Sequence, residues 1–233
     1  MANDQLFYKR KAAKPATKKS LARHHSSREP RQRALIICED AVSAPAYFRK
    51  LINYLQLNTV DVQVFGESGS APISVVNFGE KYLEADWDFD HAFFVFDKDR
   101  HESYDRALVK ITGLQRKKRY GTINIHAITS VPCFELWLLL HHRYSAKPYH
   151  ATERLSPADN LIKDIKKLVP FQDYRKDKQC AYFERIKDQI DVAIKHAERL
   201  LKNHHAETKP HHVNPSTRMH ELVQTLQKIA KSY

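Results

Sequence analysis

The stretch FFVFDKDRH, residues 93–101, runs from a block of apolar side chains directly into two aspartates that flank a lysine. Four consecutive apolar residues are typical of a strand that is covered on both faces of a sheet. Asp97 and Asp99 do not belong in such a core, because a carboxylate loses its hydration when it is buried. The stretch therefore predicts a buried strand that ends at a pair of acids.

Short apolar runs alternate with helical patterns on both sides of this strand. Four runs have the length and composition of strands: ALIIC (34–38), VDVQVF (60–65), HAFFVF (91–96) and INIHAIT (123–129). The segments between them carry apolar residues at helical spacing, as in APAYFRKLINYLQ. This rhythm predicts an α/β fold, a doubly wound and mainly parallel sheet with helices on both faces.

The rest of the chain predicts three regions. Residues 1–33 are rich in Lys, Arg, Ser and Pro and read as a disordered basic tail. Residues 34–145 form the α/β domain, in which CFELWLLLHHRY is a buried helix because it is apolar nearly all round. Residues 146–233 form a helical C-terminal region packed on that domain.

Two helices of the C-terminal region have clear patterns. A single helix over 181–203 would place apolar residues on one stripe: Ile186, Ile190, Ile194, Ala197 and Leu201. Ser216 is a plausible N-cap for a last helix with its own apolar stripe. Such stripes either dock a partner protein or cover one face of the sheet.

The charge of the chain favours a polyanionic partner. The net charge is +12 at a pI of about 9.5, and the tail alone has ten Lys and Arg against two acids. Nucleic acid is the commonest partner of such a protein, although a solubility charge or an acidic protein partner would also account for it. Three widely spaced cysteines without a CxxC pair indicate neither a disulfide framework nor a zinc ribbon. No stretch is long enough to span a bilayer, so we expect no membrane association and a cytoplasmic protein.

Acidic residues follow two of the predicted strands at the same end. Glu39 follows ALIIC, and Asp97 and Asp99 follow HAFFVF. Residues i and i+2 of an extended chain point the same way, and ligands of open parallel sheets bind at the carboxyl ends of the strands. Converging carboxylates repel each other unless a cation neutralises them, and Mg²⁺ prefers oxygen ligands. The sequence therefore predicts a Mg²⁺ (or Mn²⁺) site, the alternative being a solvated turn that caps the next helix.

The order of the acids separates two kinds of metal-dependent α/β protein from this one. A phosphatase-type DxD would follow the first strand, and a response-regulator receiver lacks a DxD on the third. A Glu after the first strand with a later DxD resembles a Toprim domain. More closely, the chain resembles the RloB-like family in four stretches: LIICEDAVSAPAYFRKL (35–51), VFDKDRH (95–101), SVPCFELWLLLHH (130–142) and NPSTRMHELV (214–223).

The resemblance implies a Toprim-like, metal-dependent nuclease that works in anti-phage (abortive infection) defence with an AAA/ABC-type, RloA-like ATPase. It also favours Glu135 as a catalytic or metal-orienting acid, whereas the residues alone equally allow favourable placement near a helix N-terminus. One departure is that the family's first motif, roughly CEGExTE, reads CEDAVSA here. Asp40 replaces the Gly and two acids are missing, which would weaken a second metal site.

Several nearby polar residues have bland and functional readings. Lys98 should point away from the acids, and His101 is a weaker candidate for protonating a leaving oxygen. Ser130 reads as an N-cap or a phosphate contact. The basic cluster LQRKKRY (114–120) is either a solvated face or a phosphate contact.

The sequence thus predicts a nuclease that hydrolyses phosphodiester bonds, with Glu39, Asp97, Asp99 and Glu135 as catalytic residues and the first three as metal ligands. RNA (including tRNA) and DNA both remain open as substrates, as does the oligomeric state. The alternative is a catalytically decayed adaptor that binds nucleic acid or the ATPase without cutting.

Overall fold

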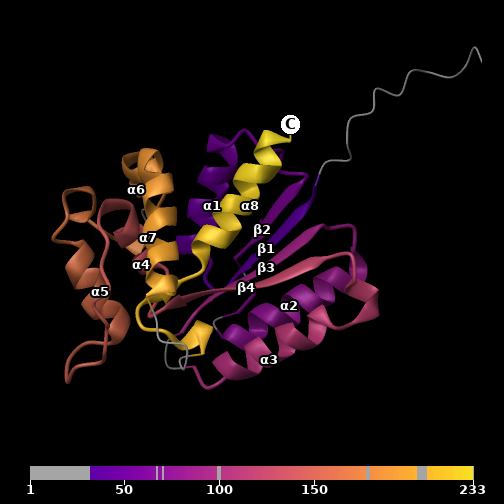
Figure 1. Ribbon diagram of the computed structural model, residues 1–233, viewed down its shortest axis with the longest axis horizontal. Helices are drawn as coiled ribbons and strands as arrows, with labels where there is room; N and C mark the ends of the chain where they lie inside the picture. Colours follow the sequence, from indigo (N-terminus) through magenta and orange to yellow (C-terminus); the bar gives the residue numbers. More distant parts are fainter. Residues whose placement is uncertain are drawn as a thin grey trace, which may run out of the picture. The chain divides into compact units, whose positions relative to one another are not determined.

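The predicted sheet is the centre of the computed structural model (Figure 1). The structure describes residues 32–66, 68–69, 71–98, 101–176, 179–203 and 209–232, with the backbone alone at 179–181 and 210. These residues form one compact unit. The basic tail expected at 1–33 lies outside them except for its last two residues, and the division of the chain at residue 145 stays a prediction.

The sheet has five strands in the order β2-β1-β3-β4-β5. The first four are parallel, and the fifth is antiparallel to its neighbour: β1 (Ala34–Cys38), β2 (Val62–Phe65), β3 (His91–Asp97), β4 (Asn124–Val131) and β5 (Ser216–Thr217). Every residue of β1 is buried, as expected for a central strand covered on both faces. The mainly parallel α/β fold predicted from the sequence is therefore confirmed, and it is consistent with a Toprim-like domain.

Alternate side chains of the strands belong to two separate hydrophobic clusters. Ile36 and Phe93 face the cluster that includes α1 (Ser43–Tyr54) and α8 (Met219–Lys231). Leu35 and its neighbours on the other face meet α2 (Pro72–Ala85) and α3 (Tyr104–Gln115). Figure 1 shows these two helix pairs on opposite sides of the sheet. The period of two along each strand thus fixes which helices it contacts.

Helix α2 approaches the sheet closely through Gly79. A Cβ atom at this position would overlap the ring edge of Phe94 and the terminal methyl of Ile37. The absence of a side chain therefore allows the backbone of α2 to pack directly on β1 and β3. Gly113 in α3 has open space around it, so its lack of a side chain answers no packing constraint.

Further helices gather beyond one end of the sheet, at the left of Figure 1. They are α4 (Glu135–His142), α5 (Pro157–Ile165), α6 (Gln179–Ile186) and α7 (Ile190–Lys202), with short 3-10 turns at Lys118–Tyr120, Val169–Phe171, Lys187–Gln189 and Pro210–His212. Helix α4 is buried along almost its whole length, as its apolar sequence predicted. No helix in the described part of the chain is long and apolar enough to cross a membrane.

The single helix predicted over 181–203 is wrong. The 3-10 turn Lys187–Gln189 divides it into α6 and α7, and the change of phase buries Leu200 in place of Leu201. The periodic stripe of Ile186 and Ile190 continues across the break, because both side chains face the same core. Periodicity alone could not locate the interruption.

The region around Ser216 also differs from the prediction. Ser216 is not an N-cap but the first residue of β5, opposite Val131 of β4, and its hydroxyl donates to the carbonyl of Val213 (2.7 Å). Helix α8 begins three residues later, where the Thr217 hydroxyl accepts a bond from the amide of Met219 (3.3 Å). The C-terminal region therefore contributes a strand as well as helices.

The apolar stripe of α8 is covered by this chain itself. Its residues Leu222, Val223, Leu226 and Ile229 are all 0% exposed. The stripe covers a face of the sheet, as the second reading of the pattern proposed. It is not an open surface for a partner.

Candidate active site

Glu39 lies directly beyond β1, and its carboxylate reaches over the end of β3. Its amide donates to the carbonyl of Val95 (3.0 Å), which extends the pairing of the two strands by one residue. Its Oε2 accepts a hydrogen bond from the amide of Asp97 (3.0 Å). The two strands are neighbours, as the sequence required for these acids to meet.

Asp97 is the last residue of β3 and is half-buried beneath the start of α4. Its Oδ2 accepts a bond from the amide of Phe134 (3.1 Å). Burial raises the pKa of Asp97 well above its ordinary value, and the nearby charges of Glu135 and Glu39 raise it further. The amide of Phe134 opposes this shift without cancelling it. Three acids thus share one weakly solvated region.

Glu135 enters this region from the first turn of α4. Its side chain is only 1% exposed, and its Oε1 accepts a hydrogen bond from the hydroxyl of Tyr174 (2.8 Å). The ammonium of Lys176 lies 3.6 Å from the same oxygen, and Glu135 raises the pKa of that lysine. The buried acid is therefore held by a partner hydroxyl and a cation, as well as by its place at a helix start.

The segment that supplies Tyr174 and Lys176 was missed by the sequence reasoning. The hydrogen bond to Tyr174 joins residues 39 positions apart, and no short motif marks either of them. Pairing of this kind depends on how the chain returns to the end of the sheet. A single sequence carries no signal of it.

Asp40 has a structural role that the altered first motif did not suggest. Its two carboxylate oxygens accept bonds from the amides of Ser43 (2.9 Å) and Ala44 (3.2 Å). These amides open α1 and have no partner within the helix. The aspartate that replaces the family's glycine therefore caps α1 beside Glu39.

A cavity of about 300 Å³ opens at this end of the sheet. Polar residues in its wall are Glu39, Asp40, Asp97, His101, Ser130 and Lys176. His101 is thus placed beside the acids, as its candidate role needs. The hydroxyl of Ser130 is bonded instead to that of Thr217 (2.9 Å) in β5, so the N-cap reading of Ser130 is wrong.

The metal-ligand set predicted from the sequence is only partly visible. Asp99 lies outside the described residues, so the geometry of the DxD pair stays a prediction. Within the parts of the chain that the structure describes, no group of three or more His, Cys, Asp or Glu side chains is arranged to hold a metal ion. Glu39 and Asp97 are nevertheless brought together by a direct hydrogen bond, with Glu135 close behind.

Lys98 points away from the acids, as its position between them predicted. Its ammonium lies 2.8 Å from Nδ1 of His212, whose Nε2 lies 2.8 Å from a carboxylate oxygen of Asp105 at the start of α3. The amide of Lys98 donates to the carbonyl of Ser130 (2.8 Å). These contacts fix the chain immediately after Asp97.

The basic cluster at residues 114–120 lies at the far end of the sheet. Helix α3 begins near the carboxyl end of β3 and returns to the start of β4, where Asn124 pairs with His91. Lys117 is bound to Glu80 (2.6 Å), and Arg119 donates to the carbonyl of Glu84. This cluster therefore does not face the acids.

Comparison with known proteins agrees with the motifs and the fold. A family model described as RloB-like protein matches residues 34–226. No curated protein and no solved structure matches the chain. The match covers the sheet, the acids at its carboxyl end and nearly all of the C-terminal helices, and the chain therefore belongs to the RloB-like family.

Proposed function

We propose that this protein is a Mg²⁺-dependent nuclease that hydrolyses phosphodiester bonds at the carboxyl end of its sheet. The observation that carries the proposal is the position of Asp97, which shares a cavity with Glu39 and lies close to the buried Glu135. A protein gains nothing in stability from three neighbouring carboxylates. Their convergence is explained by a ligand that carries positive charge.

The donor set fits a hard divalent cation. Mg²⁺ takes oxygen ligands and is held in proteins by one or two carboxylates together with water and phosphate oxygens. Glu39 and Asp97 would hold it, with Asp99 as a further ligand on the evidence of the sequence. When bound, the metal would activate water and neutralise charge on the phosphoryl group. Mn²⁺ satisfies the same preference.

Protein groups around the two ligands have supporting roles. The amide of Phe134 and the amide of Asp97 orient the carboxylates of Asp97 and Glu39. Lys176 lines the cavity and offers an ammonium to a phosphate oxygen. His101 stands in the same wall, where it can give a proton to a leaving oxygen.

The cellular role follows from family membership and charge. We place the protein in anti-phage (abortive infection) defence, where an RloA-like ATPase would restrain it until infection. The net charge of +12 supports a nucleic-acid substrate, either RNA such as tRNA or DNA. An unrestrained nuclease would damage its own host.

The test is cleavage of total tRNA and of plasmid DNA by the purified chain in Mg²⁺ and in EDTA. Glu39→Gln and Asp97→Asn should each abolish Mg²⁺-dependent cleavage while the far-UV spectrum and melting temperature are kept or raised. Asp188→Asn, an exposed acid in a distant 3-10 turn, is the matched control and should cleave normally. Full activity of both site variants would refute the proposal.

The same experiment covers the second candidate function, an adaptor without catalysis. It is favoured by the altered first motif and by the ion pair of Lys176 with Glu135, which gives the buried acid a partner in the protein itself. An adaptor would bind nucleic acid or the ATPase with and without Mg²⁺ and cut neither substrate.

A further inference from the structure

We propose that α5 and the loop facing it form a phosphate-binding pocket that holds the backbone of the nucleic-acid substrate away from the acids. A cavity of about 390 Å³ lies between them. The polar side chains that matter in its wall are Lys147, His150, Asn160, Lys163, Asp164 and Lys167. The choice of nucleic acid as ligand rests on the proposed function, whereas the binding of phosphate does not.

Both walls of this phosphate-binding pocket are fixed in place. Asn160, Lys163, Asp164 and Lys167 are spaced by three or four residues, so one face of α5 and its C-terminal continuation presents them together. The start of α5 is held by a capping box between Ser156 and Asp159. The facing loop is bound through Asn214, whose amide group bonds both the amide (3.0 Å) and the carbonyl (2.7 Å) of Tyr149.

Asp164 arranges the lysines of the pocket. It is 6% exposed, and its two oxygens accept bonds from the ammonium groups of Lys147 (2.6 Å) and Lys167 (2.7 Å). Burial alone would raise the pKa of Asp164, but the two lysines outweigh it and lower the pKa to about 2. The carboxylate therefore stays charged and tethers two flexible cations at one place.

The pocket has more positive charge than its buried acid requires. Lys163 is exposed and has no ion-pair partner among the described residues. Three lysines against one carboxylate leave an excess of two positive charges before His150 is counted. If the lysines only neutralised Asp164, one would suffice. An anion with two negative oxygens, or two successive phosphodiesters, matches the excess.

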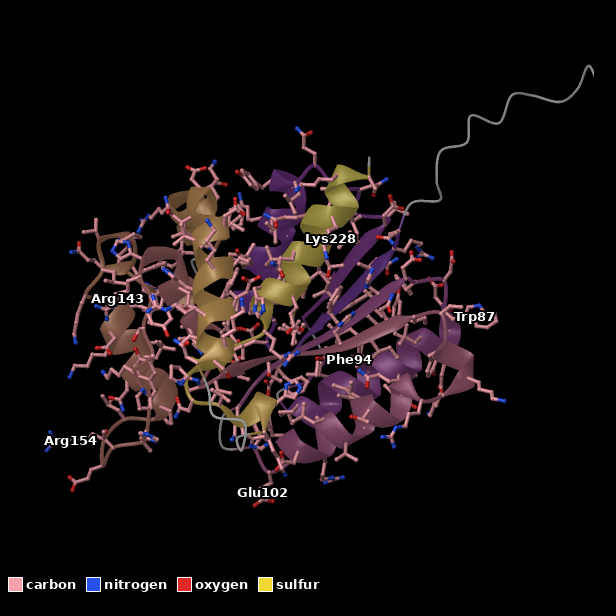
Figure 2. All side chains as sticks on the ribbon, viewed as in Figure 1. Trp87, Phe94, Glu102, Arg143, Arg154 and Lys228 are labelled. Atoms are coloured by element: carbon pink, nitrogen blue, oxygen red, sulfur yellow. The ribbon has the colours of Figure 1, made fainter. Side chains whose placement is uncertain are left out.

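The pocket is at the acid end of the molecule. Helix α5 packs on α4, which carries Glu135. The pKa of Asp159, at the start of α5, is lowered mainly by hydrogen bonds from Ser156 and also by the charge of Lys176 in the acid cavity. Figure 2 shows Arg143 and Arg154 on this same side of the molecule and Trp87 on the opposite side. A strand in the acid cavity can therefore continue along α5.

Binding is measured in EDTA with the full chain carrying Asp97→Asn, so that no cleavage occurs. The probe is a fluorescein-labelled single-stranded oligonucleotide of about 20 nucleotides, followed by anisotropy over a range of NaCl concentrations. Lys163→Gln with Lys167→Gln should weaken binding roughly tenfold at low salt. It should also reduce the slope of log affinity against log salt by about one to two, because each lost phosphate contact removes nearly one unit.

Two controls separate the pocket from charge in general. Lys166→Gln makes the same change on the same helix, at an exposed residue outside the pocket wall, and should change affinity by less than about twofold. Lys163→Gln alone leaves the ion pairs of Asp164 intact, so a loss of binding by this variant cannot come from misfolding around the buried acid. Far-UV spectra and melting curves check the double variant.

The outcomes are distinct. Equal losses from Lys163→Gln and Lys166→Gln, or no loss from either, overturn the phosphate-binding pocket. Protection of the pocket by inorganic phosphate, with oligonucleotide binding unchanged in the variants, overturns its assignment to nucleic acid. If the chain cleaves nothing but Lys163→Gln still weakens binding selectively, the pocket stands and the nuclease proposal fails.

Discussion

Replacing His141 should make the protein much less sensitive to acid. His141 lies near the end of α4 and is 1% exposed. Its Nδ1 lies 2.8 Å from the carbonyl of Trp137, which can only accept, so Nδ1 carries the proton and Nε2 accepts from the hydroxyl of Tyr47 (3.2 Å). The neutral ring joins α1 to α4, and a second proton on it would face the Tyr47 hydroxyl without a charge partner.

The size of the effect follows from the pKa of this histidine. Burial lowers it from 6.5 to about 4. A group with a lowered native pKa binds its proton more readily in the unfolded chain, so stability is complete above pH 6.5 and is lost as the pH falls towards 4. At about 1.36 kcal/mol per pKa unit, the full loss is about 3.4 kcal/mol, and about 2 kcal/mol is already lost at pH 5.

Equilibrium urea unfolding at pH 7, 6 and 5 measures this loss. His141→Gln cannot take up the proton, and its amide can still accept from Tyr47. Its free energy of unfolding should therefore fall by about 2 kcal/mol less than that of the natural chain between pH 7 and pH 5. His142→Gln, one residue along and exposed, is the control and should follow the natural chain. Equal pH dependence of all three proteins would refute the reasoning.

Two further predictions concern packing and the acid cavity. Gly79→Ala should lower the free energy of unfolding by about 1–3 kcal/mol, because the new methyl overlaps Phe94, whereas Gly113→Ala in open space should raise it by about 0.5–1 kcal/mol; urea unfolding measures both, and equal effects would contradict the packing account. Lys176→Met should tighten Mg²⁺ binding several-fold by calorimetry, because it removes a cation that lies 3.6 Å from Glu135; weaker binding would show that the lysine does not oppose the metal.

Much of the sheet could be predicted because its strands are covered on both faces. A run such as ALIIC (34–38) has few other uses in a protein of this composition, and the alternation with helices left mainly parallel arrangements to consider. The adjacency of the first and third strands, which brings Glu39 beside Asp97, was a condition of the predicted site and is met in the structure. Strand ends in a parallel sheet are thus readable from sequence.

The parts that could not be predicted depend on distant contacts. β5 is only two residues long, and a cap and a short strand look alike when the sequence offers a single Ser-Thr pair. Tyr174 and Lys176 reach Glu135 only because the segment after α5 folds back over α4. The break at Lys187–Gln189 leaves the apolar stripe in register, so the pattern contains no trace of it.

The antiparallel pairing of β5 with β4 has a consequence for how the protein is made. The hydroxyls of Ser130 and Thr217 meet across 87 residues of sequence, at the border of the acid cavity. A chain that is still growing on the ribosome cannot form this contact until residues 216–217 have emerged, by which time almost the whole protein has been synthesised. The last strand of the sheet is also the last to be translated, so the wall of the cavity beside Ser130 is completed only in a finished chain. An incomplete product would lack it, which is a useful order of assembly for an enzyme that could harm the cell producing it.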